Sequence, residues 1–268
     1  MKAIHYGRAL YGITTRELLR FTHQKERFIS ALIRPLMWLF IFAAGFRSTL
    51  GIAIIPPYET YILYEVYITP GLVGMVQLFN GMQSSLSMVY DREMGSMKTL
   101  LISPLPRWYL LSAKLLAGVI VSILQAYLFL IIAYIYGVEA PLMGYIAALP
   151  ALVLSGLMLG ALGLLLSSCI KQLENFAGIM NFVIFPMFFL STALYPLWKV
   201  QESSTLLYQI SKLNPFTYAV ELIRFALYGQ LDLEAAMITL VALLTFLSLA
   251  VMGYNPKMGI LNRGKGRG

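Results

Sequence analysis

Three residues near the C-terminus have the spacing of a phosphate-binding loop. Gly259, Gly264 and Lys265 match the pattern G-x-x-x-x-G-K, in which backbone N–H groups and a lysine hold nucleotide phosphates. A functional loop continues with Ser or Thr and joins a strand to a helix whose N-terminus binds phosphate. Here the pattern lies in a basic tail without these features, so we expect no nucleotide site in this chain.

Other combinations of residues that carry chemistry are also missing from the sequence. Its one cysteine, Cys169, and its two histidines, His5 and His23, are too few for a metal centre. The apolar segments contain no Ser/His pair, no paired carboxylates and no H-E-x-x-H pattern. We therefore expect no catalytic residues, no metal and no cofactor in this chain, and an intramembrane enzyme or a membrane scaffold is a weak alternative.

The composition predicts an integral membrane protein. Of the 268 residues, 59% are hydrophobic and 12% are charged, about half of the roughly 25% charged residues found in soluble domains. A membrane-spanning helix needs about 20 apolar residues. On this criterion we predict an all-α fold with six transmembrane helices, at residues 28–46, 69–90, 109–136, 142–170, 176–197 and 235–254.

The distribution of Lys and Arg predicts the orientation. Most of them fall in the N-terminal segment, in the loop after the second span and in the tail. The cations counted with that loop are Arg92, Lys98, Arg107 and Lys114, and only Arg47, Lys199, Lys212 and Arg224 fall on the other side. Because basic residues collect in cytoplasmic loops, we expect both termini in the cytoplasm and the chain in the inner (cytoplasmic) membrane. The net charge of +8 is then a property of the topology and indicates no nucleic acid.

The chain is thus expected to divide into three parts. These are a cytoplasmic interfacial segment, 1–28, a membrane domain, 29–254, and a basic cytoplasmic tail, 255–268. The first of them contains a roughly amphipathic stretch that favours a helix lying on the cytoplasmic face.

Two stretches inside the membrane domain are too polar to span. Within the loop at 91–106, Met94, Met97 and Leu101 share one face of a possible short cytoplasmic helix; an ordinary connecting loop is an equal alternative. The external stretch 198–230 predicts short helices.

Asn214 and Pro215 interrupt that external stretch, and a helix is expected after them at residues 216–228. Glu221 and Arg224, three residues apart on this helix, are expected to pair.

Three motifs in this order resemble the type-2 ABC exporter permeases, which include drug, polysaccharide and nodulation-factor exporters. They are Arg34-Pro35-Leu36 with Trp38; Arg92-Glu93-x-Gly95-Ser96-x-x-x-Leu100-Leu101-x-x-Pro104 with Arg107 and Lys114; and Leu213-Asn214-Pro215-Phe216-x-Tyr218 with Arg224 and Gly229. The resemblance covers nearly the whole chain. This chain departs from many relatives at Lys98, where they carry an acidic residue. An acidic counterpart is therefore expected on the protein that this loop contacts.

The resemblance implies a partner and a contact surface. The loop at 91–106 would be a coupling helix that docks in a groove of a separate ATPase subunit, present in two copies and holding ATP and Mg, and the N-terminal helix would add a second contact. The residues expected to couple to the ATPase are Asp91, Arg92, Glu93, Met94, Gly95, Met97, Lys98, Leu100 and Leu101, with Arg16, Glu17 and Arg20.

The resemblance also implies a substrate pathway, because the second and fifth spans of two such subunits enclose the central cavity. The polar and aromatic residues expected there are Gln77, Asn80, Ser84, Asn181, Phe182, Phe185 and Phe189. For any one of them, packing and hydrogen bonding between helices is an equal alternative. An aromatic, uncharged cavity favours an amphipathic or hydrophobic organic molecule, lipid or glycan.

The predicted function is therefore the permease subunit of an ATP-binding-cassette exporter, acting as a homodimer. The alternative is an ion- or proton-coupled carrier or channel that works without ATP. Such carriers place ionisable groups inside the membrane, whereas none of the six predicted spans has Asp, Glu, Lys or His near its middle.

Overall fold

The computed structural model describes residues 3–23, 25–42, 45, 55–94, 106–170 and 172–254. Every regular element within these ranges is helical, which confirms the predicted all-α class. Three of the described helices are long and apolar enough to cross a membrane: Trp108–Ile135, Leu142–Cys169 and Leu233–Gly253. They lie at three of the six predicted spans, and the six-span topology stays a prediction.

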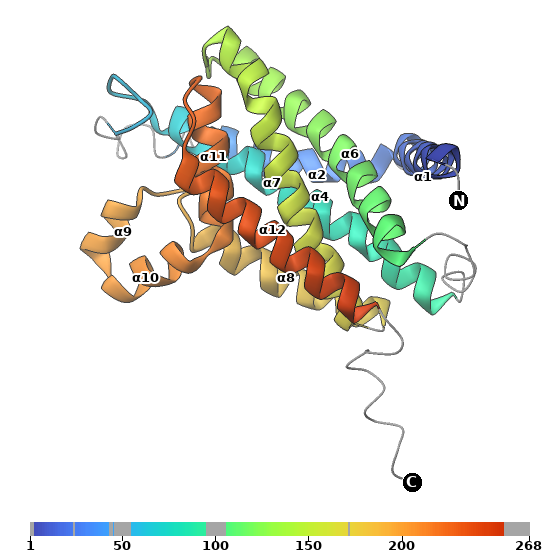
Figure 1. Ribbon diagram of the computed structural model, residues 1–268. Helices are drawn as coiled ribbons and strands as arrows, with labels where there is room; N and C mark the ends of the chain where they lie inside the picture. The colour runs from blue at the N-terminus through green and yellow to red at the C-terminus, as the bar shows by residue number, and fades with distance from the viewer. Residues whose placement is uncertain are drawn as a thin grey trace.

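The chain forms a bundle of long helices with short helices at its periphery (Figure 1). In chain order the elements are α1 (Ala3–His23), α2 (Lys25–Met37), the π-helical turn η1 (Trp38–Phe42), α4 (Tyr64–Glu93), α6 (Arg107–Ile135), α7 (Leu142–Cys169), α8 (Leu173–Phe189), α9 (Leu197–Ser203), α10 (Thr205–Leu213), α11 (Pro215–Leu227) and α12 (Leu233–Gly253).

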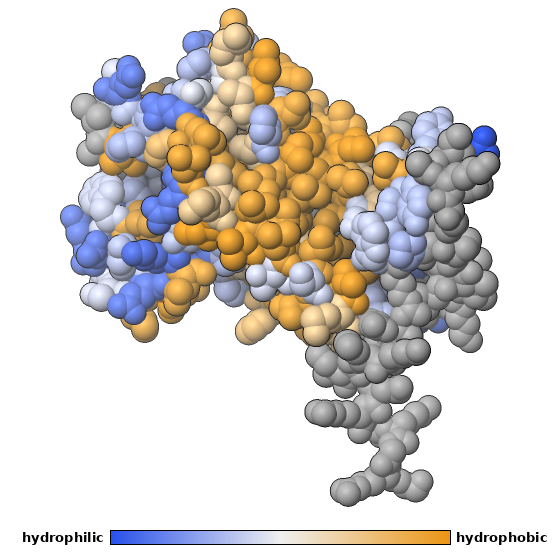
Figure 2. Space-filling model, viewed as in Figure 1, coloured by the Kyte–Doolittle hydropathy of each residue, from blue (hydrophilic) through white to orange (hydrophobic). Residues whose placement is uncertain are grey.

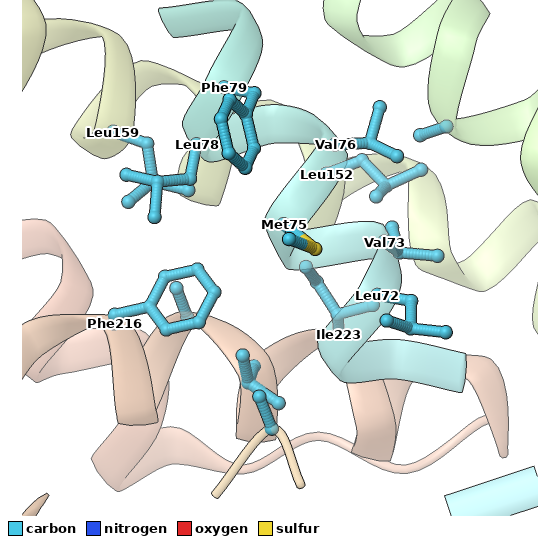
Figure 3. Packing of buried hydrophobic residues seen from close by; sticks show 14 of the residues in the cluster. Leu72, Val73, Met75, Val76, Leu78, Phe79, Leu152, Leu159, Phe216 and Ile223 are labelled. Atoms are coloured by element: carbon cyan, nitrogen blue, oxygen red, sulfur yellow. The ribbon is translucent and has the colours of Figure 1, made fainter. Parts of the chain in front are cut away.

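Helix α7 is the centre of the bundle. It packs most extensively against α12 and α4 and also contacts α11 and α6. Its sequence is apolar on all sides, which is the pattern of a helix surrounded by others. Figure 3 shows Leu78 and Phe79 of α4, Leu159 of α7 and Phe216 of α11 in the core that these helices share.

Glycines bring α4 and α7 into backbone contact. A Cβ added to Gly81 would lie 3.0 Å from the Cα of Gly160, and one added to Gly163 would lie 2.6 Å from the carbonyl oxygen of Gly81. Small residues allow helix backbones to approach this closely in a membrane, where dispersion contacts drive helix association. The close seam fixes α4 against the central helix.

The bundle has two ends, each with its own contacts between helices. At one end the hydroxyl of Tyr109 donates to the carbonyl of Tyr6, the N–H of Leu173 donates to the carboxylate of Glu93 at 3.3 Å, and Ser167 and Tyr254 share a hydrogen bond of 2.7 Å. This is the α1 end, where α4, α7 and α12 finish and α6 and α8 begin.

The opposite end is the α11 end. There a Cβ on Gly144 would collide with the carbonyl of Leu227, so the start of α7 abuts the end of α11. The side chain of Gln230 donates to the carbonyl of Pro57 at 3.4 Å. Hydrophilic residues gather around α9 and α10 at this end, while apolar side chains cover the face formed by α12 (Figure 2).

Candidate functional site

Gln77, a predicted pathway residue, lies between α4 and α7. Its side chain is 1% exposed. Its Nε2 donates to the carbonyl of Leu152 at 2.7 Å, and its Oε1 accepts a 2.6 Å hydrogen bond from the hydroxyl of Ser155. Both amide atoms are therefore satisfied within the chain, as buried amides require.

Asn80 and Ser84 continue this polar face toward α6. The Nδ2 of Asn80 donates to the Oε1 of Gln125, and both side chains are buried. Ser84 is half-buried, and its hydroxyl lies 2.9 Å from where a Cβ on Gly118 would stand. Gln77, Asn80 and Ser84 thus face the chain's own α6 and α7. This is the arrangement expected if they serve packing and hydrogen bonding between helices.

A small cavity of about 10 Å³ lies along this polar face. Gln77, Ser84, Lys114 and Ser122 line it, together with glycines of α4, α6 and α7. This is room for about one water molecule, far below the several hundred Å³ of a site for an organic ligand. In this conformation the cavity is not a path for such a molecule.

The predicted residues of α8 lie on the surface of the chain. The exposed fractions are 78% for Phe182, 46% for Phe185 and 43% for Phe189, and Asn181 is exposed beside them. The rings of Phe185 and Phe189 stack with centroids 6.2 Å apart. We call Phe182, Phe185 and Phe189 the α8 aromatic surface.

The Arg-Pro-Leu-x-Trp motif supports this surface. Pro35 lies inside α2, where it supplies no N–H to the helix, and the chain continues in the wider turn η1. Trp38 in that turn contacts Phe188 and Phe189, with ring centroids 5.8 and 5.7 Å apart. The structure therefore joins η1 to α8 but does not bring the α8 aromatic surface together with Gln77, Asn80 and Ser84.

Only part of the predicted coupling surface is described. Asp91 is half-buried, and Glu93 and Met94 are exposed at the end of α4, with Met94 64% exposed. On α1, Arg16 and Glu17 pair at 3.1 Å. Outside the described part of the chain lie Gly95, Met97, Lys98, Leu100 and Leu101, together with the side chains of Arg92 and Arg20.

Lys114 differs from its expected place among the cations of the loop. It lies inside α6, 5% exposed, and its Nζ donates to the Oδ2 of Asp91 at 3.3 Å. Sequence reasoning missed this burial because the residue follows the loop closely. It also missed Gln125 and Ser155, the partners of Asn80 and Gln77. A polar residue alone in an apolar span could have indicated them, because such groups form hydrogen bonds with neighbouring helices.

Asn214 and Pro215 explain the break in the external stretch. The Oδ1 of Asn214 caps α11 by accepting from the N–H of Phe216 at 3.0 Å, and Pro215 occupies the first turn, where no N–H is needed. The Nδ2 of Asn214 donates to the carbonyls of Met187 and Leu190 at the end of α8. One side chain thus starts α11 and ties it to α8.

Arg224 lies at the centre of the α11 end. It is 1% exposed, and its Nη2 donates to the carbonyl of Thr192 at 2.8 Å while Nη1 pairs with Glu221, as predicted. Its guanidinium lies over the ring of Tyr67, 4.1 Å from the centroid. Burial alone would lower the pKa of Arg224, but the Glu221 carboxylate outweighs it and the pKa is raised.

Two neighbouring phenols belong to the same cluster. Tyr58 and Tyr228 contact each other edge to face, with centroids 4.8 Å apart. Burial raises the pKa of Tyr58 well above its ordinary value and raises the pKa of Tyr228 to about 12. Both phenols are therefore neutral at physiological pH, so the guanidinium of Arg224 and the carboxylate of Glu221 carry the charge of the cluster.

Comparisons with known proteins place this geometry in context. A family model described as ABC-2 type transporter matches residues 8–228. The protein ycf38 of Cyanophora paradoxa, named as a transport permease, is 26% identical over 221 residues, which are 81% of this chain and 73% of that protein. YbhR of Escherichia coli (strain K12), named as a multidrug ABC transporter permease, is 30% identical over 168 residues, 62% of this chain and 44% of that protein. Nodulation protein J of Rhizobium leguminosarum bv. viciae is 30% identical over 100 residues, 35% of this chain and 38% of that protein.

Proposed function

Since the chain belongs to the ABC-2 type transporter family, we propose that it is the membrane permease of an exporter driven by a separate ATPase subunit. The observation that carries the proposal is the family match, which runs from α1 to the end of α11. The chain would supply the route through the membrane and the partner would hold ATP and Mg, in two copies. Both termini would lie in the cytoplasm, together with the α1 end.

The contact with the ATPase is proposed at the α1 end. The segment 95–105 connects α4 to α6, and the exposed Glu93 and Met94 lead into it. A short helix there, with Met97 and Leu101 for apolar contact, would suit a groove of the partner, because methionine adapts to irregular surfaces. Charged residues at its edges would set the register.

Co-purification tests this contact directly. We expect the tagged chain to retain an ATPase when it is purified from membranes, and Leu101→Asp to lose that ATPase while still inserting. Leu213→Asp is the matched control, an equal change at a position that is 84% exposed at the α11 end. Retention of the ATPase by the Leu101 variant would exclude this coupling site. Uphill transport by the purified chain alone would favour the ion- or proton-coupled carrier.

Two copies are proposed to face each other across the α8 aromatic surface. Met37 and Ile41, on either side of Trp38 in the chain, are also exposed, by 52% and 60%, and aromatic residues and methionine are enriched in protein interfaces. We expect Phe182→Cys in a Cys169→Ser background to cross-link two copies. Met237→Cys, 66% exposed on α12, is the control and should not cross-link. Equal cross-linking of both variants would refute the interface.

The substrate is proposed to be an amphipathic or hydrophobic organic molecule, lipid or glycan. The α8 aromatic surface would offer rings and no charge to such a molecule. The side chains of Gln77 and Asn80 form hydrogen bonds within the chain here, and the hydroxyl of Ser84 faces Gly118 of α6. Helix α4 would therefore have to move from α6 and α7 before these residues could meet the substrate. Unchanged substrate-stimulated ATP hydrolysis in both Phe185→Ala and Asn80→Ala would remove these residues from the pathway.

A further inference from the structure

One exposed cation of the bundle lies beside an aromatic ring. Arg34, in the last turn of α2, is exposed, and its guanidinium carbon is 4.5 Å from the centroid of the Phe79 ring of α4. Contact with a ring occupies none of the N–H donors of a guanidinium. Within the part of the chain that the structure describes, these donors meet no carboxylate and no other hydrogen-bond acceptor.

This guanidinium lies level with the middle of a membrane-spanning helix. On either side of Phe79 along α4, Gln77 accepts from Ser155 and Gly81 lies against Gly160. Both partners belong to the middle part of α7, which is long and apolar enough to cross a membrane. An arginine near the end of a span can extend to the interface, whereas mid-depth is about 15 Å from either interface. An ionisable group at this depth is costly and is a functional site by default.

The α8 aromatic surface adjoins this cation. Trp38 follows Arg34 by one helical turn, and the centroid of its ring is 5.7 Å from that of Phe189. Helix α2 packs against α4, and α4 packs against α8. The exposed rings of Phe182 and Phe185 therefore lie near an exposed guanidinium that has donors to offer. Together they present a positive group beside an apolar surface.

We propose that Arg34 binds the anionic head group of an amphiphile whose apolar part lies on the α8 aromatic surface, and that it makes the permease selective for such molecules. A guanidinium pairs with phosphate or carboxylate through N–H donors that match two oxygens at once. It repels a cationic amphiphile and gains no ion pair from a neutral one. The proposal rests on the proposed function, because it names the class of molecule carried: an amphiphile with a phosphate or carboxylate head.

The first test measures binding to the chain without its ATPase. The substitutions Trp108→Phe and Trp198→Phe leave Trp38 as the reporter, and the chain is purified in an uncharged maltoside detergent. Three probes carry the same bromine-tipped chain, which quenches tryptophan on contact: ω-bromoundecyl phosphate, ω-bromoundecanol and ω-bromoundecyl trimethylammonium. We expect the phosphate to quench at about tenfold lower concentration than the alcohol, the gain from one charge-assisted pair. Equal binding of the phosphate and the trimethylammonium would overturn the proposal.

Variants of Arg34 test whether this residue is the source of the preference. In Arg34→Met we expect the phosphate to bind about tenfold more weakly, and unchanged quenching by the alcohol would show that the aromatic surface is still folded. Arg34→Lys should keep part of the preference, because it keeps the charge but not the planar set of donors. Lys212→Met, which removes an exposed cation of α10, is the control and should keep all of it. An unchanged affinity for the phosphate in Arg34→Met would overturn the proposal.

Phe185→Ala tests the apolar half of the site. The ring of Phe185 is 46% exposed and stacks on that of Phe189. Its removal should weaken the phosphate and the alcohol by the same factor, about fivefold, because both lose the same apolar contact. Unchanged quenching by both probes would show that the apolar part does not lie on the α8 aromatic surface, and the proposal would fail.

The last test separates a transported molecule from a resident membrane lipid, since both can carry an anionic head. The complex with its ATPase is placed in phosphatidylcholine vesicles, and ATP hydrolysis is measured with ω-bromoundecyl phosphate. We expect stimulation in the unaltered complex and in Lys212→Met, and its loss in Arg34→Met. Binding without stimulation would assign the head group to a membrane lipid and overturn the role of Arg34 in selecting the transported molecule. A chain that retains no ATPase would count against the proposed function, whereas the quenching measurement would still decide whether Arg34 binds the anion.

Discussion

Replacement of Arg224 by methionine should destabilise the α11 end strongly. The guanidinium is 1% exposed, donates to the carbonyl of Thr192 and lies over the ring of Tyr67. Methionine fills part of the space but leaves the carboxylate of Glu221 without its partner. Breaking a buried ion pair costs about 3–5 kcal/mol, and because the side chain of Glu221 is 19% exposed we expect a loss near the lower limit, about 3 kcal/mol.

The loss can be measured by thermal unfolding in detergent, followed by tryptophan fluorescence. With about 2–4 °C per kcal/mol for a chain of this size, the melting temperature should fall by about 6–12 °C. Lys212→Met removes an exposed cation of the neighbouring helix α10 and should change the melting temperature little. The melting temperature of Arg224→Lys should lie between those of Arg224→Met and Lys212→Met. Lysine keeps the charge but has neither the planar set of donors of arginine nor its flat contact with the tyrosine ring.

A double-mutant cycle separates the ion pair from simple packing. Glu221→Gln combined with Arg224→Met removes both charges, so the double variant should be more stable than Arg224→Met alone. We expect a coupling free energy of about 2 kcal/mol, within the range for contacting residues. Additive effects of the two substitutions, or equal melting temperatures of Arg224→Met and Lys212→Met, would show that the cluster does not hold α11 in place.

Three further changes test other contacts. Gly163→Ala places a Cβ 2.6 Å from the carbonyl of Gly81 and should destabilise the chain by about 1–3 kcal/mol, whereas Gly178→Ala, in open space, should not; equal melting temperatures would contradict the α4–α7 seam. Asn214→Ala removes the cap of α11 and two hydrogen bonds to α8, so unfolding should begin at the α11 end, seen as faster hydrogen exchange there and not at the α1 end. Because burial raises the pKa of Tyr228 to about 12, the phenol ionises at lower pH in the unfolded chain, and the free energy of unfolding should fall between about pH 10 and 12. A Tyr228→Phe chain should lose less stability over this range. Identical pH profiles of the two chains would argue against the burial of this phenol.

Local sequence patterns were enough to find most of the helices. The apolar run after Arg107 predicted a helix at 109–136, and α6 occupies Arg107–Ile135. Asn214 and Pro215 predicted the break before α11, because an asparagine cap and a proline in the first turn act within a few residues. The pairing of Glu221 with Arg224 was also predictable, since residues three apart lie on the same face of one helix.

Partners on other helices were decided by the tertiary structure alone. Helix α7 is apolar on all sides, so its sequence does not indicate which face meets α4, and the partners of Gln77 depend on the rotation and depth of both helices. Lys114 lies only seven residues after Arg107, yet the packing of α1 and α4 against α6 turns it from an apparent loop cation into a buried one. Short-range geometry determines a helix and its ends, whereas burial and ion pairs between distant segments exist only once the helices have packed.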